Sequence, residues 1–294
     1  MNSVPPITLL IIATLLWGGN FAYGRAVADE LPPFTFAFIR WCLAFIIFLP
    51  IVWKPLKKEW RLIKRYWLIV LAMSLTGIVG FTALVYLALH YTTSINASLV
   101  NTSTPILIYI ISFVFFKERL NKNQLLGTFI SLVGLLCIIS KGSFQSFLEL
   151  SFNRGDLLVV TAVICWSIYS TLVKQYAQKL PVHSTFLVTI LVGIIILFPF
   201  FLYETWNPAI NVIWSIKSIS AIFYTGIFAS IVAFLSWNTG VVKIGANKAG
   251  IYLNLIPVFA TVFAVLFIEE SIQLFHIVGG FFTILGVYLT SKKG

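Results

Sequence analysis

The side chains of this chain that could recognise a small molecule are aromatic rings, amides and hydroxyls inside long apolar segments. Trp17 and Asn20 lie one helical turn apart, and Trp166 and Tyr169 repeat that spacing 149 residues later. A tryptophan ring offers a large stacking surface, and an asparagine amide both donates and accepts hydrogen bonds. Such a set can hold a planar or zwitterionic solute without a net charge. The candidate solute-binding residues are Trp17, Asn20, Arg40, Ser98, Asn101, Thr102, Trp166, Tyr169, Asn238 and Asn254.

A second polar stripe also occurs twice in the chain. Asn101 stands one helical turn before Pro105, and Leu253 stands in the same place before Pro257. A proline inside a helix frees the carbonyl one turn earlier, so these carbonyls would bind solute or let the helix flex. The alternative is that the polar groups only tie helices together, at about 0.6 kcal/mol each. The matching of the faces in the two halves favours a cavity.

Arg40 is a charged side chain in the interior of an apolar segment. It lies about 10 Å along that segment from its start, at about 1.5 Å per residue. An arginine at this depth is by default a hypothesis of function: it would attract a solute carboxylate or hold a gate near the outer mouth. The alternatives are structural: the side chain extends to the lipid headgroups, or it pairs with Asp29, Glu30 or Glu269.

The sequence does not indicate the chemistry of an enzyme, a metal centre or an ATP-driven pump. All nine acidic residues lie in loops or at the ends of apolar segments. Histidine, cysteine and acidic residues do not cluster as metal ligands do, and no nucleophile stands beside a base. No glycine-rich phosphate loop occurs. We therefore expect no catalytic residue, no metal and no cofactor, and no coupling ion can be named.

The composition places these residues in a membrane. Hydrophobic residues make up 60% of the 294 residues and charged residues 10%, against about 25% charged residues in soluble domains. The net charge of +11 lies in short loops between apolar segments, which argues against nucleic acid as a partner. The expected partners are the lipid bilayer and a small-molecule solute. We expect the first apolar segment to be retained as a helix and not removed as a signal peptide.

Ten segments are apolar enough to cross a bilayer, for which a helix needs about 20 residues. The sequence therefore predicts an all-α integral membrane protein with ten transmembrane helices. The predicted spans lie near residues 6–25, 33–53, 67–89, 94–116, 123–140, 156–175, 184–203, 217–240, 246–268 and 274–291.

The distribution of charge predicts that both termini are cytoplasmic. In that orientation 15 of the 20 basic residues face the cytoplasm, whereas most acidic residues face outward. The cytoplasmic basic residues would be Lys54, Lys57, Lys58, Arg61, Lys64, Arg65, Lys117, Arg119, Lys122, Lys174, Lys179, Lys243, Lys248, Lys292 and Lys293.

The two halves of the chain repeat the same landmarks. Pro105 and Glu118 recur 152 residues later as Pro257 and Glu270. Because each half has five spans, the second half is inverted in the membrane, as in many transporters. We expect two inverted five-helix repeats, at residues 1–145 and 152–294.

Glycines recur on single faces of spans five and ten, where they allow helices to approach closely. We expect these faces to pack within each repeat. The alternative is a homodimer through the glycine faces of the two spans. The glycines are Gly127, Gly134, Gly279 and Gly286.

The ordered set of motifs resembles the drug/metabolite transporter superfamily, and its EamA-type ten-helix branch in particular. The first half carries Leu16-Trp17-Gly18-Gly19-Asn20-Phe21, Phe36-Ala37-Phe38-Ile39-Arg40-Trp41, the stretch from Ala97 to Pro105, and Phe116-Lys117-Glu118-Arg119-Leu120. The second half carries the stretch from Ala249 to Pro257 and Phe267-Ile268-Glu269-Glu270. Span six departs from the pattern, because Cys165-Trp166-Ser167-Ile168-Tyr169 lacks the paired glycines.

The resemblance covers essentially the whole chain and implies export or exchange of small metabolites. With the polar faces, it predicts a secondary transporter in the bacterial inner (cell) membrane that carries neutral or zwitterionic solutes, such as amino acids or amphipathic drugs, by alternating access. The alternative is a membrane scaffold or sensor that transports nothing.

Overall fold

The computed structural model describes residues 4–92, 97, 100–118, 121–139, 154–268 and 274–291. Within these ranges all regular secondary structure is helical, which confirms the all-α prediction there. The predicted site residue Ser98 and the acidic residues Glu269 and Glu270 lie outside the described residues.

The first half begins its helices at prolines, which fit the first turn because their missing N–H is not needed there. Pro6 starts the first helix, Pro33 starts the second, and Pro105 lies in the first turn of α6. At the end of α6, Lys117 adopts a left-handed conformation with φ 58°. The elements are α1 (Pro6–Ala26), α2 (Pro33–Arg65), α3 (Trp67–Met73), the π-helix η1 (Ser74–Gly80), α4 (Phe81–Leu89), α6 (Thr104–Phe116) and α7 (Lys122–Ile139).

The second half follows a similar order of helices. Gly245, at φ 90°, makes the turn between the eighth predicted span and the ninth. The elements are α9 (Arg154–Gln175), α10 (Val182–Trp206), α11 (Ile216–Tyr224), the π-helix η2 (Thr225–Val232), α12 (Ala233–Ile244), α13 (Ala246–Gly250), the 3₁₀-helix η3 (Ile251–Asn254), α14 (Leu255–Ile268) and α15 (Leu274–Ser291).

Two elements differ from their predicted form. α2 continues to Arg65 through the basic segment that was expected to be a loop, with Pro50 and Pro55 inside the helix. Residues 56–65 are rich in leucine, lysine and arginine, which are strong helix formers. The ninth predicted span is not one α-helix, because a 3₁₀ turn at η3 interrupts it just before Pro257.

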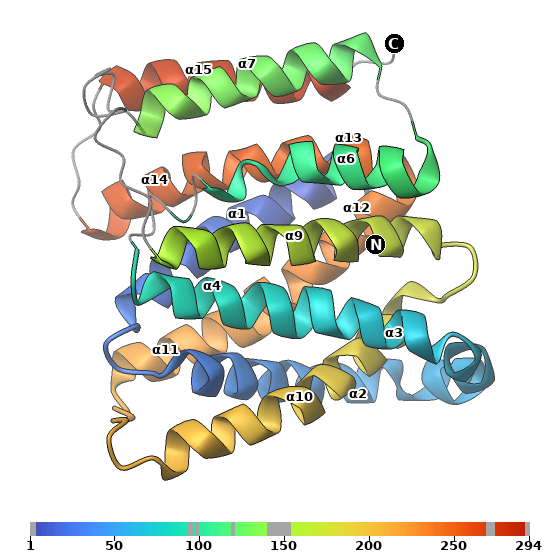
Figure 1. Cartoon of the computed structure of the whole chain (residues 1–294), viewed down its shortest axis with the longest axis vertical. Coiled ribbons are helices and arrows are strands. Elements are labelled where there is room, and N and C mark those ends of the chain that lie inside the picture. Colours follow the sequence, from blue (N-terminus) through green and yellow to red (C-terminus); the bar gives the residue numbers. More distant parts are fainter. Residues whose placement is uncertain are drawn as a thin grey trace.

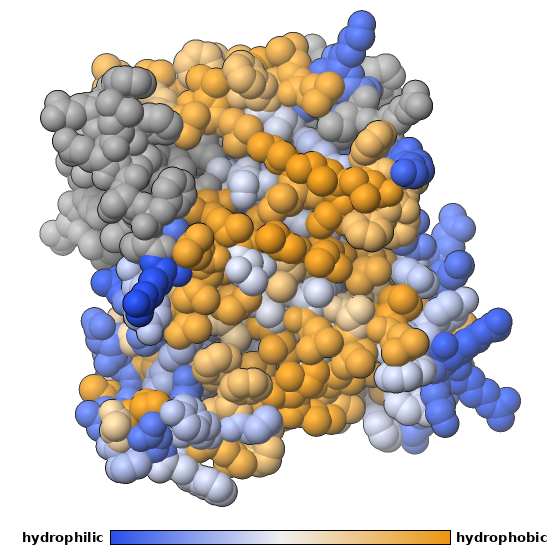
Figure 2. Space-filling model, in the orientation of Figure 1, coloured by the Kyte–Doolittle hydropathy of each residue, from blue (hydrophilic) through white to orange (hydrophobic). Residues whose placement is uncertain are grey.

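Much of the outer surface of the helices is apolar (Figure 2). Large side chains such as Ile46, Phe115 and Ile195 are exposed there, as expected of residues that face lipid. Six helical stretches in the described part of the chain are long and apolar enough to cross a membrane: Pro6–Ala26, Pro33–Arg65, Trp67–Leu89, Arg154–Gln175, Val182–Trp206 and Ile216–Ile244. Thr104–Phe116 and Ile277–Leu289 are shorter apolar helices. The count of ten spans and the inverted repeats stay predictions.

The helices run roughly side by side, and the chain turns back at two opposite ends (Figure 1). α7 packs on α15 along one side of the bundle and α2 packs on α10 along the other, with α1 and α9 between. The α1–α2 and α10–α11 connections lie at the left end of Figure 1. The α2–α3 corner and both termini lie toward the right.

The glycine faces of α7 and α15 pack against each other, which corrects the expectation that they pack within each repeat. A Cβ atom on Gly134 would lie 2.5 Å from the carbonyl oxygen of Gly279, and one on Gly286 would collide with that of Gly127. Only glycine allows backbones to approach this closely. All four glycines are buried within the single chain.

Candidate functional site

A cluster of aromatic rings joins the two halves at the centre of the bundle. Trp17 of α1 and Trp166 of α9 meet edge to face, with ring centroids 5.0 Å apart and an interplanar angle of 86°. Phe234 of α12 contacts both rings, at 5.6 and 5.2 Å. Trp17 and Trp166 are 5% and 1% exposed. The two predicted tryptophans therefore face each other inside the bundle and not the lipid.

The π-helix η2 holds two of the predicted site residues in place. Its Ala229 carbonyl accepts a hydrogen bond of 3.1 Å from Trp17 Nε1, and its Ser230 Oγ accepts one of 2.9 Å from Arg40 Nε. A π-helix pairs each N–H with the carbonyl five residues earlier, and such stretches are frequent at functional sites. In the first half, η1 takes the corresponding place and passes Gly77 directly beneath the ring of Tyr169.

Arg40 is fully buried in a shell of neutral groups. Besides Ser230, its guanidinium donates to Asn20 Oδ1 at 3.1 Å and to the hydroxyl of Tyr86. Tyr86 in turn donates to Asn20 Oδ1 at 2.8 Å, and the Arg40 carbon Cζ lies 5.1 Å from the ring centre of Trp41. The exposure of 1% shows that the side chain does not extend to the headgroups.

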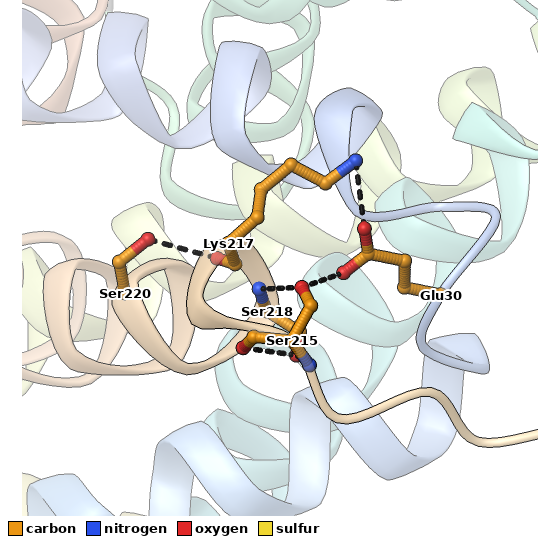
Figure 3. A network of polar contacts seen from close by, with 5 residues as sticks. All are labelled: Glu30, Ser215, Lys217, Ser218 and Ser220. Atoms are coloured by element: carbon orange, nitrogen blue, oxygen red, sulfur yellow. Dashed lines mark hydrogen bonds and ion pairs between the residues drawn. The ribbon is translucent and has the colours of Figure 1, made fainter.

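The alternative in which Arg40 pairs with Glu30 is wrong, because the Glu30 carboxylate binds Lys217 and Ser215 instead (Figure 3). Its carboxylate lies 2.9 Å from Lys217 Nζ and accepts a hydrogen bond of 2.5 Å from Ser215 Oγ. Lys217 and Ser215 lower the pKa of Glu30. Ser215 also caps α11, so this contact joins the loop after α1 to the start of α11. Among the described residues no carboxylate is bonded to Arg40.

Residues of both halves line a pocket beside the aromatic cluster, which we call the central pocket. α1, α2 and α4 contribute from the first half, and α9, α12, η3 and α14 contribute from the second. Five predicted site residues lie here together: Trp17, Asn20, Arg40, Asn101 and Trp166. The complete lining is Trp17, Asn20, Phe21, Arg40, Phe81, Thr82, Asn101, Trp166, Phe234, Leu253 and Ile256.

Two further predicted residues lie in a neighbouring pocket, which we call the lateral pocket. Tyr169 donates a hydrogen bond of 3.0 Å to Asn238 Oδ1, and Asn238 Nδ2 lies 2.8 Å from the Tyr169 hydroxyl. The ring of Tyr169 is 5.3 Å from that of Trp166, so the two pockets adjoin. The lateral pocket is lined by Met73, Tyr169, Val173, Tyr176, Ala177, Leu180, Val182, Thr185, Phe186, Thr189 and Asn238.

Two more predicted residues, Asn254 and Thr102, are buried but do not line either pocket. Asn254 in η3 donates a hydrogen bond of 2.9 Å to Ser131 of α7, so its amide ties two helices together. Thr102 is 4% exposed. The carbonyl of Asn101, which Pro105 was expected to free for solute, accepts a hydrogen bond from the hydroxyl of Thr104.

Sequence reasoning missed the third predicted span as a wall of the site. Thr82 lines the central pocket, and Tyr86 holds both Arg40 and Asn20. These two residues are four positions apart, a spacing that puts both on one face of a helix. That spacing was available in the sequence as a signal. Within the ranges that the structure describes, no three histidine, cysteine or acidic residues gather as a metal site.

Comparison with known proteins places this chain among membrane transporters. The sequence model of the EamA-like transporter family matches residues 4–140 and again residues 153–292. An "Uncharacterized transporter" of Archaeoglobus fulgidus is 31% identical over 303 residues, which cover 100% of this chain and 99% of that protein. The "Uncharacterized transporter YyaM" of Bacillus subtilis is 28% identical over 285 residues, covering 96% and 92%.

A solved structure, described only as "Crystal structure of protein", shares the fold. It superposes on this chain with a TM-score of 0.76 at 18% sequence identity. The match covers 97% of this chain and 96% of that one.

Proposed function

Because this chain belongs to the EamA-like transporter family, we propose that it is a secondary transporter that exports or exchanges small organic solutes by alternating access. The solutes are neutral or zwitterionic metabolites such as amino acids, or amphipathic drugs. The protein would sit in the cell membrane with both termini in the cytoplasm, as ten spans in two inverted repeats at residues 1–145 and 152–294.

The observation that carries the proposal is the composition of the central pocket. Trp17 and Trp166 come from the two separate matches to the family, and they meet at its wall. A site shared by two halves is what alternating access requires, since each half must contact the solute while they move past each other. A scaffold would have no need of a buried charge and amides beside an internal pocket.

The route through the protein would pass the aromatic cluster. The lateral pocket is lined in part by Tyr176, Leu180 and Val182 from the α9–α10 connection, which lies at the same end of the bundle as the basic end of α2. We assign that end to the cytoplasm, in line with the charge distribution. A solute would then move between the lateral and central pockets as Trp166, Tyr169 and Phe234 separate.

Solute counterflow in proteoliposomes tests the function. Vesicles that contain the purified protein and a high internal concentration of one unlabelled solute should accumulate the labelled form, across a panel of amino acids and drugs. Protein-free vesicles are the control. Counterflow for none of the solutes, by protein that remains folded, would favour the scaffold or sensor.

A further inference from the structure

Two hydrogen-bond donors of the central pocket are buried without a partner among the described residues. They are Nε1 of Trp166 and Nδ2 of Asn101, and both side chains are 1% exposed. A buried donor without an acceptor is costly and rare in native proteins. Both side chains line the central pocket, so an acceptor placed in this pocket would satisfy them.

Three other buried tryptophans in this region each have an acceptor for the indole N–H, so Trp166 is an exception. Trp17 Nε1 donates to the Ala229 carbonyl, Trp41 Nε1 to Thr82 and Trp237 Nε1 to Ser170. The packing of this region thus supplies an acceptor to three buried indoles, including that of Trp17 in the wall of the central pocket, and leaves the indole of Trp166 without one. The acceptor oxygen of Asn20 is also occupied, by Arg40 and Tyr86.

Arg40 adds a positive charge to these two donors. Its Nε and Nη1 atoms bond to neutral groups, which leaves Nη2 without a protein acceptor in the part of the chain that the structure describes. A buried cation is normally paired with an anion. The central pocket therefore combines one unneutralised charge with free donors from two further side chains.

We propose that the central pocket, once the two halves have moved apart and widened it, binds the carboxylate of an organic solute whose apolar or aromatic remainder lies against Trp17, Phe81 and Phe234. A carboxylate only accepts hydrogen bonds and forms bidentate pairs with arginine. A phosphate dianion would call for a second cation, and Arg40 is the one cation lining this pocket. The inference rests on the proposed transport function and narrows its solutes to those that carry a carboxylate, which excludes cationic drugs.

Matched pairs of ligands test the proposal on the purified full-length protein. Phenylacetate, indole-3-acetate and L-phenylalanine are each titrated against their own primary amide by isothermal titration calorimetry. The amide keeps the shape of the acid and removes the negative charge of the carboxylate. At least one acid should bind about tenfold or more tightly than its amide, as expected of charge-assisted hydrogen bonds. Equal or tighter binding of every amide, or no binding of any acid, would overturn the proposal.

Conservative variants test whether the preference for an acid over its amide arises in the central pocket. Trp166→Phe and Asn101→Leu remove the free donors and keep most of the packing, so each should lower the acid-to-amide affinity ratio several-fold. Trp237→Phe is the matched control, because its indole donates to Ser170 and does not line the central pocket, and the ratio should stay unchanged. A ratio that stays constant in Trp166→Phe and in Asn101→Leu would contradict the assignment.

Counterflow separates this inference from the proposed function. Transport of amides and amines as fast as that of acids would leave the transporter in place and refute the carboxylate site. Selective binding of acids with no counterflow of any solute would keep the site and refute transport.

Discussion

At Arg40 a full positive charge lies inside the bundle with neutral partners in the described residues. A buried charge without an anionic partner carries a desolvation penalty, which an apolar side chain of similar size would remove. A charge that serves only as a structural anchor should behave differently, because its hydrogen bonds to Asn20, Tyr86 and Ser230 would then outweigh that penalty. Measurements of stability and of solute binding therefore distinguish a binding role of Arg40 from a structural anchoring role.

We expect Arg40→Met to keep or raise the melting temperature in detergent and to lose the binding of carboxylate solutes. Methionine is unbranched and adapts to the space left by the arginine. The melting temperature and the calorimetric affinity are measured on the same preparation, with Arg40→Lys as the variant that keeps the charge and part of the affinity. A loss of more than about 2 kcal/mol in stability, with solute affinity unchanged, would identify Arg40 as an anchor.

The pairing of Glu30 with Lys217 makes a prediction about pH. Because Lys217 and Ser215 lower the pKa of Glu30 below its ordinary value of 4.5, the ionised form favours the folded state. The contribution of ionised Glu30 to the stability of the fold is present at neutral pH, and it is lost as the pH falls below 4.5 and through the lowered pKa of Glu30. The melting temperature of the wild type should therefore fall more steeply with acidification than that of Glu30→Gln. Parallel curves for the two proteins would show that the contact contributes nothing to stability.

At the scale of the elements, the contact of α7 with α15 depends on glycines that leave no room for a side chain. Gly134→Ala would place its methyl group 2.5 Å from the Gly279 carbonyl oxygen, so the helices must separate, at a cost of about 1–3 kcal/mol. Thermal unfolding in detergent measures this loss.

The matched control for Gly134→Ala is Gly280→Ala on α15. A Cβ atom at Gly280 would meet nothing within 4 Å, and alanine favours a helix over glycine by up to about 1 kcal/mol. Its stability should be unchanged or higher. Equal effects of the two substitutions would mean that the close approach of the helices does not matter.

The positions of the helices could be predicted from the sequence wherever the apolar pattern alone determines where a helix begins and ends. The predicted ranges 67–89 and 274–291 coincide with α3 to α4 and with α15. The extension of α2 and the 3₁₀ turn at η3 were not predicted, because neither changes the apolar pattern from which the spans were located. The π-helices η1 and η2 also leave that pattern unchanged, although η2 carries Ser230, the partner of Arg40 Nε.

The sequence predicts which site residues share a helix face, but it does not predict which residues of different helices contact one another. Helical spacing put Trp17 and Asn20 on one face and Trp166 and Tyr169 on another. Packing then directs Tyr169 to the lateral pocket and Trp166 to the central pocket. It also brings Tyr86 from the third span to Arg40. Contacts between distant segments depend on helix rotation, which a single sequence does not specify.

At the scale of the whole molecule, the orientation in the membrane is a prediction that chemical labelling can test. Lys58 in the last part of α2 and Asn211 in the α10–α11 connection are exposed, and these two segments lie at opposite ends of the bundle (Figure 1). In a variant without Cys42, Cys137 and Cys165, a cysteine at position 58 should resist impermeant thiol reagents in intact cells, and one at position 211 should react. The opposite labelling pattern would show that the protein has the reverse orientation, and labelling of both cysteines would indicate a mixture of the two orientations.

The length of α2 makes the protein sensitive to the lipids around it. Its 33 residues span about 50 Å at 1.5 Å per residue, well beyond the hydrocarbon core of about 30 Å. The excess carries exposed basic residues beside Trp53 and Trp60, and it lies at the right-hand end of the bundle (Figure 1), where the surface in Figure 2 is hydrophilic. Such a segment is attracted by the negative surface potential of anionic lipids, with about 1 kcal/mol for each basic residue near the surface. We therefore expect the depth and tilt of this protein in a vesicle to depend on the fraction of anionic lipid. They should also depend on the salt concentration, because salt screens the charge of the lipid.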